Sequence, residues 1–304
     1  MSLVDHPPRR IAWALYAMSR PSQLLLIAVV YGTGVAAGVA RLGGFEPIDT
    51  ILGLFALLPV ATSVHYANEY ADFVPDALAT RTPFSGGSGA LVRTGLPRRL
   101  AGYAAGVTGF VGAVGVTVCL SRGHVGATGA GVLVIIAILG WGYSLPPPAL
   151  ARRGLGEIDN AVLGGLALPL YGHVAVTGRL GPDAVVAFLP LTGLVFLNLL
   201  ATTWPDRAVD GAAGKATLAT RLDPKRLRVI YAGGVVGTVV ALAGGWVVGA
   251  VPVPVVVGTL PAAPFVGWGW ITYTRRASPF PAVAAMVVAV VGQLAGWLVV
   301  AGVA

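Results

Sequence analysis

Asn68, Asp72 and Asp76 place an amide and two carboxylates at intervals of four residues, directly after a long apolar run. Four residues advance an α-helix by slightly more than one turn, so these side chains can form one polar stripe. A second pair, Asp206 and Asp210, repeats the spacing at the end of another apolar run. Mg²⁺ prefers a few carboxylate oxygens together with phosphate oxygens of a substrate. The two clusters therefore predict a site for two Mg²⁺ ions and a phosphorylated substrate.

A solvated helix end is the alternative explanation for either acidic cluster taken alone. Both clusters, however, follow apolar runs long enough to cross a bilayer, and ionisable groups near a bilayer are costly and usually functional. We therefore interpret them as metal ligands. The predicted ligands are Asn68, Asp72, Asp76, Asp206 and Asp210, with Asp72 and Asp210 as the predicted catalytic residues.

The composition is that of a polytopic membrane protein. Of the 304 residues, 56% are hydrophobic and only 11% are charged, which is more apolar sequence than a soluble core needs. The single cysteine, Cys119, lies in an apolar stretch, which excludes a disulfide framework and a cysteine metal site. The net charge of +8 is spread over short connections between apolar runs, so membrane topology explains it better than binding to nucleic acid.

Nine stretches of about 20 apolar residues can each cross a bilayer as an α-helix. They lie near residues 22–41, 50–70, 100–120, 125–145, 158–178, 183–205, 227–249, 252–273 and 281–303. We therefore predict an all-α polytopic fold, with nine transmembrane helices around a central cavity in a single domain, 1–304. Residues 1–20 form a cytosolic segment, with an interfacial helix at 11–18. A cleaved signal peptide is the alternative for the first span, disfavoured because more membrane sequence follows.

The distribution of basic residues predicts the orientation. With a cytosolic amino terminus, seventeen of the 20 Lys and Arg residues fall on the cytosolic side. Only Arg41, Arg122 and Arg179 fall on the opposite side. This positive-inside bias predicts a multi-pass protein of the cell membrane with both acidic clusters at the cytosolic face.

Two prolines lie at the acidic clusters. Pro205 directly precedes Asp206, where we expect it to end the sixth span and start a fresh helical turn. Pro75 would clash with the carbonyl of Ala71 in a straight helix, so we expect a kink or a helix end there.

The motifs resemble those of the UbiA superfamily of intramembrane prenyltransferases. The resemblance rests on NxxxDxxxD at 68–76, DxxxD at 206–210, Arg20-Pro21, SGGSG at 85–89, YSLPP at 143–147, GLGE at 154–157 and GKATL at 214–218. The SGGSG, GLGE and GKATL elements are more similar to the branch that prenylates 1,4-dihydroxy-2-naphthoate in menaquinone biosynthesis than to the 4-hydroxybenzoate branch.

This resemblance implies Mg²⁺-dependent transfer of a prenyl group from a prenyl diphosphate to an aromatic acceptor, among membrane lipids. Two Mg²⁺ ions would neutralise the leaving diphosphate, and the aromatic carbon would attack the allylic cation where water is largely excluded. It implies diphosphate contacts from Arg81, Arg153 and Lys215, and substrate contacts from Tyr143, Ser144 and His65. The alternatives are topology charges for the cations, an interfacial anchor for Tyr143 and a packed core histidine for His65.

Rival functions share part of this pattern. Another acceptor, such as hydroxybenzoate, a glycerol phosphate ether lipid or a porphyrin, would use the same scaffold, and so would a terpene cyclase. A cation-coupled transporter is disfavoured, because the acids cluster at one face and leave no polar path across the membrane. The sequence contains no Walker A motif and no glycine fingerprint after a strand, so no nucleotide cofactor is expected.

Overall fold

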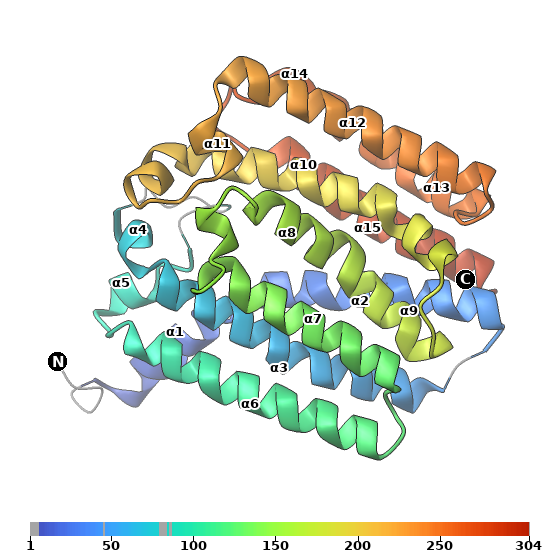
Figure 1. Cartoon of the computed structure of the whole chain (residues 1–304), viewed down its shortest axis with the longest axis horizontal. Coiled ribbons are helices and arrows are strands. Elements are labelled where there is room, and N and C mark those ends of the chain that lie inside the picture. Colours follow the sequence, from blue (N-terminus) through green and yellow to red (C-terminus); the bar gives the residue numbers. More distant parts are fainter. Residues whose placement is uncertain (1–5, 45, 79–83, 85–86, 304) are drawn as a thin grey trace.

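The computed structural model describes residues 6–44, 46–78, 84 and 87–303. Within these ranges every regular element is a helix (Figure 1). The elements are α1 (Pro8–Met18), α2 (Pro21–Leu42), α3 (Pro47–Ala71), α4 (Phe73–Leu78), α5 (Ala90–Thr94), α6 (Arg99–Ser121), α7 (Ala127–Ser144), η2 (Leu150–Arg152), α8 (Gly156–Val162), η3 (Leu163–Ala167), α9 (Leu168–Thr177), α10 (Pro182–Ala212), α11 (Leu218–Arg221), α12 (Pro224–Val247), α13 (Val253–Thr259), η4 (Leu260–Ala262), α14 (Ala263–Thr272) and α15 (Phe280–Val300).

Nine helical stretches of the described chain are long and apolar enough to cross a bilayer. The first is a composite of α1 and α2, the fifth of α8, η3 and α9, and the eighth of α13, η4 and α14. All nine coincide with predicted spans to within a few residues, except that the first and sixth extend further. The prediction of an all-α fold with nine membrane spans is therefore confirmed, and the protein is a multi-pass membrane protein.

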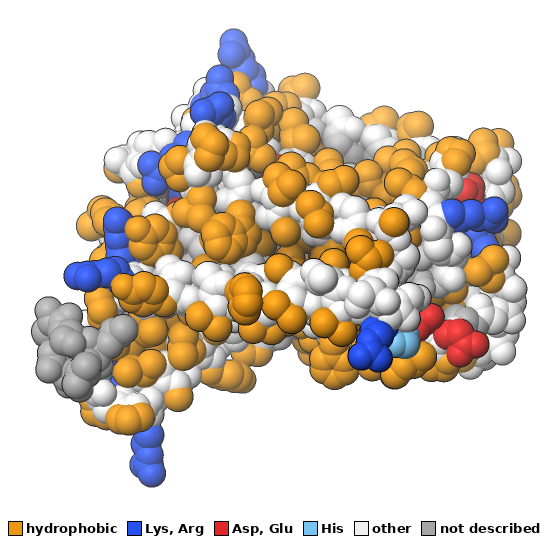
Figure 2. All heavy atoms as spheres, turned by 60° about the horizontal axis from the view of Figure 1, so that its bottom comes forward, with side chains coloured by type: hydrophobic (Ala, Val, Ile, Leu, Met, Phe, Trp, Pro, Cys, Tyr) orange, Lys and Arg blue, Asp and Glu red, His pale blue; other side chains and the backbone are white. Residues whose placement is uncertain are grey.

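The outer surface of the bundle is suited to lipid. Large apolar side chains project from the outer helices, including Phe110 of α6 and Val229 and Val247 of α12, each at least 70% exposed. Figure 2 shows hydrophobic side chains over the flank of the molecule, with charged side chains gathered towards its two ends. An α-helix satisfies its own backbone hydrogen bonds, so such a surface can face hydrocarbon.

Some spans approach one another backbone to backbone. A methyl group at Gly34 of α2 would overlap the carbonyl of Pro169 in α9. In the same way Gly258 of α13 and Gly292 of α15 lie directly against each other. Small residues at such crossings let helices pack closely where water supplies no driving force between them.

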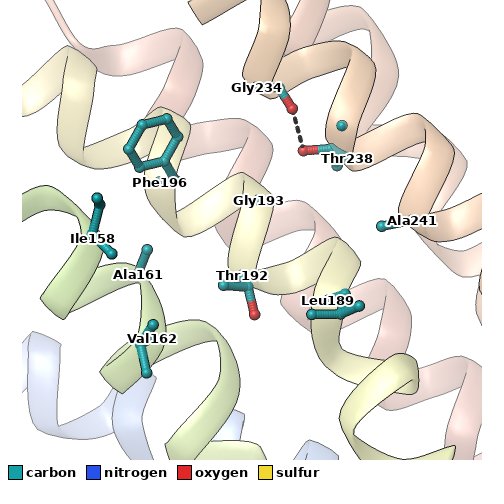
Figure 3. Close-up of a pocket in the computed structure, with 11 residues that line it drawn as sticks. Ile158, Ala161, Val162, Leu189, Thr192, Gly193, Phe196, Gly234, Thr238 and Ala241 are labelled. Carbon is teal, nitrogen blue, oxygen red and sulfur yellow. Dashed lines mark hydrogen bonds between the residues drawn. The ribbon is translucent and has the colours of Figure 1, made fainter. Parts of the chain in front are cut away.

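An apolar recess opens between α8, α10 and α12 (Figure 3). Its volume is about 370 Å³, and Ile158, Phe196 and Leu189 are among the side chains that line it. The hydroxyl of Thr238 donates to the Gly234 carbonyl oxygen of its own helix at 2.8 Å, so it offers no free polar group to the recess. The recess is therefore a hydrocarbon-compatible hollow.

The two prolines at the acidic clusters behave differently. Pro205 lies inside α10, which continues to Ala212, so the expected helix end there is wrong. A proline removes only one backbone bond, and membrane helices tolerate that loss when neighbouring groups re-satisfy the freed carbonyl. The break expected near Pro75 is present, because α3 ends at Ala71 and Pro75 falls in the first turn of α4, where its missing N–H costs little.

Both acidic clusters lie at the same end of the bundle. The carboxyl ends of α3 and α10 meet there, together with the short elements α1, α4, α5 and α11 (left side of Figure 1). The predicted helix at 11–18 is present as α1, whose buried Ala14 and Met18 pack in one cluster with Tyr66 of α3 and Leu91 of α5. The short helices thus form a layer around the ends of the spans that contain the acids.

Candidate functional site

The two acidic clusters converge on one cation, the ammonium group of Lys215. Its Nζ lies 2.9 Å from Oδ2 of Asp72 and 3.4 Å from Oδ1 of Asp210. The three side chains are 13%, 9% and 12% exposed, respectively, so water screens their charges only weakly. Two carboxylates and one ammonium group give these three side chains together a net negative charge, which favours the binding of a further cation.

Lys215 is positioned by the loop that follows α10. Its backbone N–H donates to the Asp210 carbonyl oxygen at 2.9 Å, and its own carbonyl oxygen accepts from the Thr220 hydroxyl at 3.2 Å. The next residue, Ala216, donates its N–H to the Ala151 carbonyl oxygen at 3.2 Å. Burial by itself would lower the pKa of Lys215, but the carboxylates of Asp72 and Asp210 outweigh burial and raise that pKa, so the amine is charged.

Asn68 connects the first acidic cluster to α7. Its Nδ2 donates to Asp72 Oδ2 and to Ser144 Oγ, both at 2.9 Å. Its Oδ1, the atom that would bind a metal, accepts from Nη2 of Arg20 at 2.9 Å. In this arrangement Asn68 orients Asp72, and direct coordination of a metal by Asn68 stays a prediction.

Asp76 faces the glycine-rich loop. Its carboxylate lies against Gly87, whose φ of 60° is in the left-handed region. Burial, followed by the charges of Asp72 and Glu69, raises the pKa of Asp76 to about 7. A divalent cation nearby would favour the ionised carboxylate.

Asp206 completes the set of predicted ligands, half-buried one turn before Asp210 on α10. Within the described part of the chain, no three His, Cys, Asp or Glu side chains are grouped closely enough to hold a metal ion by themselves.

The three residues predicted to contact substrate have different surroundings. Ser144 is buried and accepts a hydrogen bond from Asn68, and its contact with a substrate stays a prediction. The ring of Tyr143 lies against Gly156 of α8, where a methyl group would be 3.0 Å from Cε2 of the ring. Nδ1 of His65 lies 2.8 Å from the Ser19 carbonyl oxygen at the α1–α2 junction, which agrees with the packed-histidine alternative.

The predicted diphosphate contacts also differ. Lys215 is central, as described above. Arg153 is exposed, and its Nη2 donates to the Pro147 carbonyl oxygen at 2.9 Å. Arg81 lies outside the described residues, so its role stays a prediction.

Two of the buried carboxylates at this end, Glu69 and Glu157, lie inside the predicted motifs but were not among the predicted site residues. Glu69, only 3% exposed, accepts hydrogen bonds from Arg20 and Ser88. Glu157, only 2% exposed, accepts from the Leu218 N–H at 2.7 Å and so ties the GLGE element to the GKATL element. Their positions inside the motifs could have identified them from the sequence. Their hydrogen-bond partners could not have been identified in this way, because these lie far away in the sequence.

The glycine-rich loop offers a direct test of the contact with Asp76. Gly87→Ala is expected to lower the prenyl transfer that the family resemblance implies at least about tenfold, because the new methyl group would displace the Asp76 carboxylate. Gly95→Ala is the matched control, since Gly95 also has a left-handed φ, of 69°, but no atom lies within 4 Å of the added methyl group. Initial rates with Mg²⁺ at saturating prenyl diphosphate would measure both. Equal losses in the two variants would assign the effect to backbone strain instead.

Comparisons with known proteins show the fold and the family. No curated protein sequence matches the chain. Two solved structures of a UbiA homolog from Archaeoglobus fulgidus match it, one bound to DMAPP and Mg²⁺ (16% identity, TM-score 0.70) and one bound to GPP and Mg²⁺ (15%, 0.69). A structure of digeranylgeranylglyceryl phosphate synthase matches at 12% identity and TM-score 0.65. Each match covers 95% of this chain and 99% of the other, which shows a shared fold. The model of the UbiA prenyltransferase family matches residues 25–291, most of the chain, and the protein therefore belongs to that family.

Proposed function

We propose that the protein transfers a prenyl group from a prenyl diphosphate to an aromatic acceptor in the membrane, with 1,4-dihydroxy-2-naphthoate as the acceptor in menaquinone biosynthesis. The observation that carries the proposal is the convergence of the two acidic clusters on Lys215. A buried site with excess negative charge beside one lysine suits the joint binding of Mg²⁺ and diphosphate. Membership of the prenyltransferase family supports the same reaction class.

The residues proposed to hold Mg²⁺ are Asn68, Asp72, Asp76, Asp206 and Asp210. Mg²⁺ held by these residues would supply Lewis-acid stabilisation of the charge that develops on the diphosphate as the allylic C–O bond breaks. Lys215 is the proposed partner of the diphosphate oxygens, because its charge is held at the junction of both clusters. Arg81 and Arg153 are further proposed diphosphate contacts.

The acceptor is proposed to contact Tyr143 and Ser144 at the end of α7 and His65 on α3. The hydrogen bond between Ser144 and Asn68, a member of the first acidic cluster, supports this proposal. The aromatic carbon attacks the allylic cation and the acceptor carboxylate leaves as carbon dioxide. Exclusion of water protects the cation from hydrolysis.

The choice of naphthoate over other acceptors rests on the SGGSG, GLGE and GKATL elements. Two of the three are tied together at the site by the hydrogen bond from Leu218 N–H to Glu157. Mass spectrometry would test this choice, using purified protein with Mg²⁺, several prenyl diphosphates and a panel of aromatic and lipid acceptors. The expected product is the prenylated, decarboxylated naphthoquinol. Product from hydroxybenzoate or a glycerol phosphate lipid alone would reassign the acceptor, and a cyclised terpene formed without acceptor would indicate a cyclase.

We also propose that the protein lies in the cell membrane with a cytosolic amino terminus. In a Cys119→Ala background, cysteines introduced for Arg99 and Lys225 should react with an impermeant thiol reagent only from the cytosolic side. A cysteine in place of Arg122 should react only from the opposite side. All three positions are exposed in the folded chain. Reaction of the first two from different sides would contradict the nine-span orientation.

A further inference from the structure

Glu69 is a buried acid whose two oxygens are both engaged by hydrogen-bond donors. Its Oε1 accepts from Arg20 Nη2 at 2.6 Å and Nε at 3.2 Å, and from the Ser88 N–H at 2.8 Å. Its Oε2 accepts from the Ser88 hydroxyl at 2.6 Å. A carboxylate with four charge-assisted or short hydrogen bonds is strongly fixed. Glu69 is thus poorly placed to be a metal ligand, although it directly follows Asn68.

The first partner of Glu69 is Arg20, whose backbone has an unfavourable conformation. Arg20 is the N-cap residue of α2, with φ 52° and ψ 66°, a left-handed geometry that is unfavourable for a residue with a side chain. Such a conformation persists only where its surroundings stabilise it, and the ion pair with Glu69 does so here. The same guanidinium donates to Asn68 Oδ1 at 2.9 Å, and Asn68 in turn orients Asp72.

The second partner of Glu69 is the turn Gly87–Gly89. Ser88, only 5% exposed, lies between two glycines with left-handed φ values of 60° and 64°. Its hydroxyl oxygen also accepts from the Ala90 N–H at 3.1 Å, which links the turn to α5. Gly87, the residue before Ser88, lies against the Asp76 carboxylate. Fixing Ser88 therefore also fixes the backbone that contacts the first acidic cluster at Asp76.

We propose that Glu69 is a positioning residue that binds Arg20 and the turn Gly87–Gly89 to the first acidic cluster, and so sets the geometry in which that cluster receives the metal–diphosphate group. The proposal rests on the proposed function for the identity of the ligand. The contacts themselves join the α1–α2 junction, the end of α3 and the start of α5 through one carboxylate.

Hydrogen exchange and kinetics of Glu69→Gln would test the proposal in purified protein. The amide keeps the size of the side chain but replaces an acceptor oxygen by a donor. Exchange of backbone amides in the peptide 87–94 is expected to become at least about tenfold faster. The KM for prenyl diphosphate is expected to rise at least about tenfold, with kcat changed less than about threefold, because the acids that act in the chemical step remain.

Asp49→Asn is the matched control. Asp49 lies at the opposite end of the same helix, α3, and its carboxylate pairs with Nδ1 of His124 at 2.8 Å. This variant also removes a carboxylate that makes a side-chain contact from α3, but neither exchange of the peptide 87–94 nor the KM should change. Ser88→Ala is a second, milder variant that removes only the 2.6 Å bond to Oε2, and it should accelerate exchange of the same peptide.

The exchange result does not depend on catalysis, so failure of the proposed reaction and failure of this proposal are distinguishable. Unchanged exchange of the peptide 87–94 in Glu69→Gln or, if that variant does not fold, in Ser88→Ala would overturn the proposal. A second result would also overturn it. If Glu69→Gln and Asp49→Asn lowered thermal stability and kcat to the same extent and left the KM unchanged, Glu69 would only stabilise the fold.

Discussion

Asp72→Asn and Asp210→Asn are each expected to reduce prenyl transfer at least about a thousandfold. Both residues lie within reach of one cation in a nearly closed site, and each substitution removes a full negative charge where metal is proposed to bind. Asparagine retains the shape of the side chain. Alanine is a poorer choice, because it would also remove the oxygen that accepts hydrogen bonds and leave a void in a buried site.

Single-turnover assays with labelled prenyl diphosphate and Mg²⁺ would measure these losses, with melting temperatures as the check on folding. Asp183→Asn provides the matched control, since Asp183 lies at the other end of α10 and pairs with Nε of Arg41 at 2.9 Å. Its activity should stay near that of the wild type. Full activity of Asp210→Asn, or an equal loss in Asp183→Asn, would contradict the assignment of the acidic clusters as the metal site.

Lys215→Ala is expected to lower turnover of prenyl diphosphate about 10- to 150-fold, the equivalent of a charge-assisted contact worth about 1.5–3 kcal/mol. A second effect follows from its contacts with Asp72 and Asp210. Without the ammonium group the two buried carboxylates lose their partner, so the metal-free variant should melt at a lower temperature. Added Mg²⁺ should then raise the melting temperature of Lys215→Ala more than that of the wild type.

Steady-state kinetics and thermal melts in EDTA and in Mg²⁺ would measure both effects. Arg275→Ala is the control, because Arg275 is exposed and carries the same charge at a turn between two spans. Similar small effects of Lys215→Ala and Arg275→Ala on kinetics and on melting would indicate that Lys215 contributes only to the membrane orientation of the chain.

The spans and the acidic clusters could be predicted because both signals are local. A run of about 20 apolar residues determines a membrane helix whatever surrounds it. The spacing of Asn68, Asp72 and Asp76 survives the helix break, since Asp72 N–H donates to the Asn68 carbonyl oxygen and Asp76 N–H to that of Asp72, both at 2.8 Å. The break moved from Pro75 to Asp72 because proline is compatible with the first turn of a new helix.

Pairings between distant segments could not be predicted. Lys215 meets Asp72 across 143 positions, and nothing in the spacing of either motif indicates that the loop after α10 returns to the end of α3. Glu69 directly follows Asn68 in the first motif. Its partner Ser88 lies 19 residues further along the chain, so the sequence gives no sign of this contact. The continuation of α10 through Pro205 was also unpredictable, because it depends on packing around the freed carbonyl.

The glycine contacts between spans restrict how the bundle can move. Where Gly258 meets Gly292, and where Gly34 meets Pro169, backbone lies against backbone without side chains that could change rotamer. The close approach leaves these crossings without a side chain that could fill a gap, so we expect α13 with α15, and α2 with α9, to stay in contact when the bundle moves. Any breathing that admits a long hydrocarbon substrate must therefore occur along seams filled by side chains, where rotamer changes can absorb the displacement.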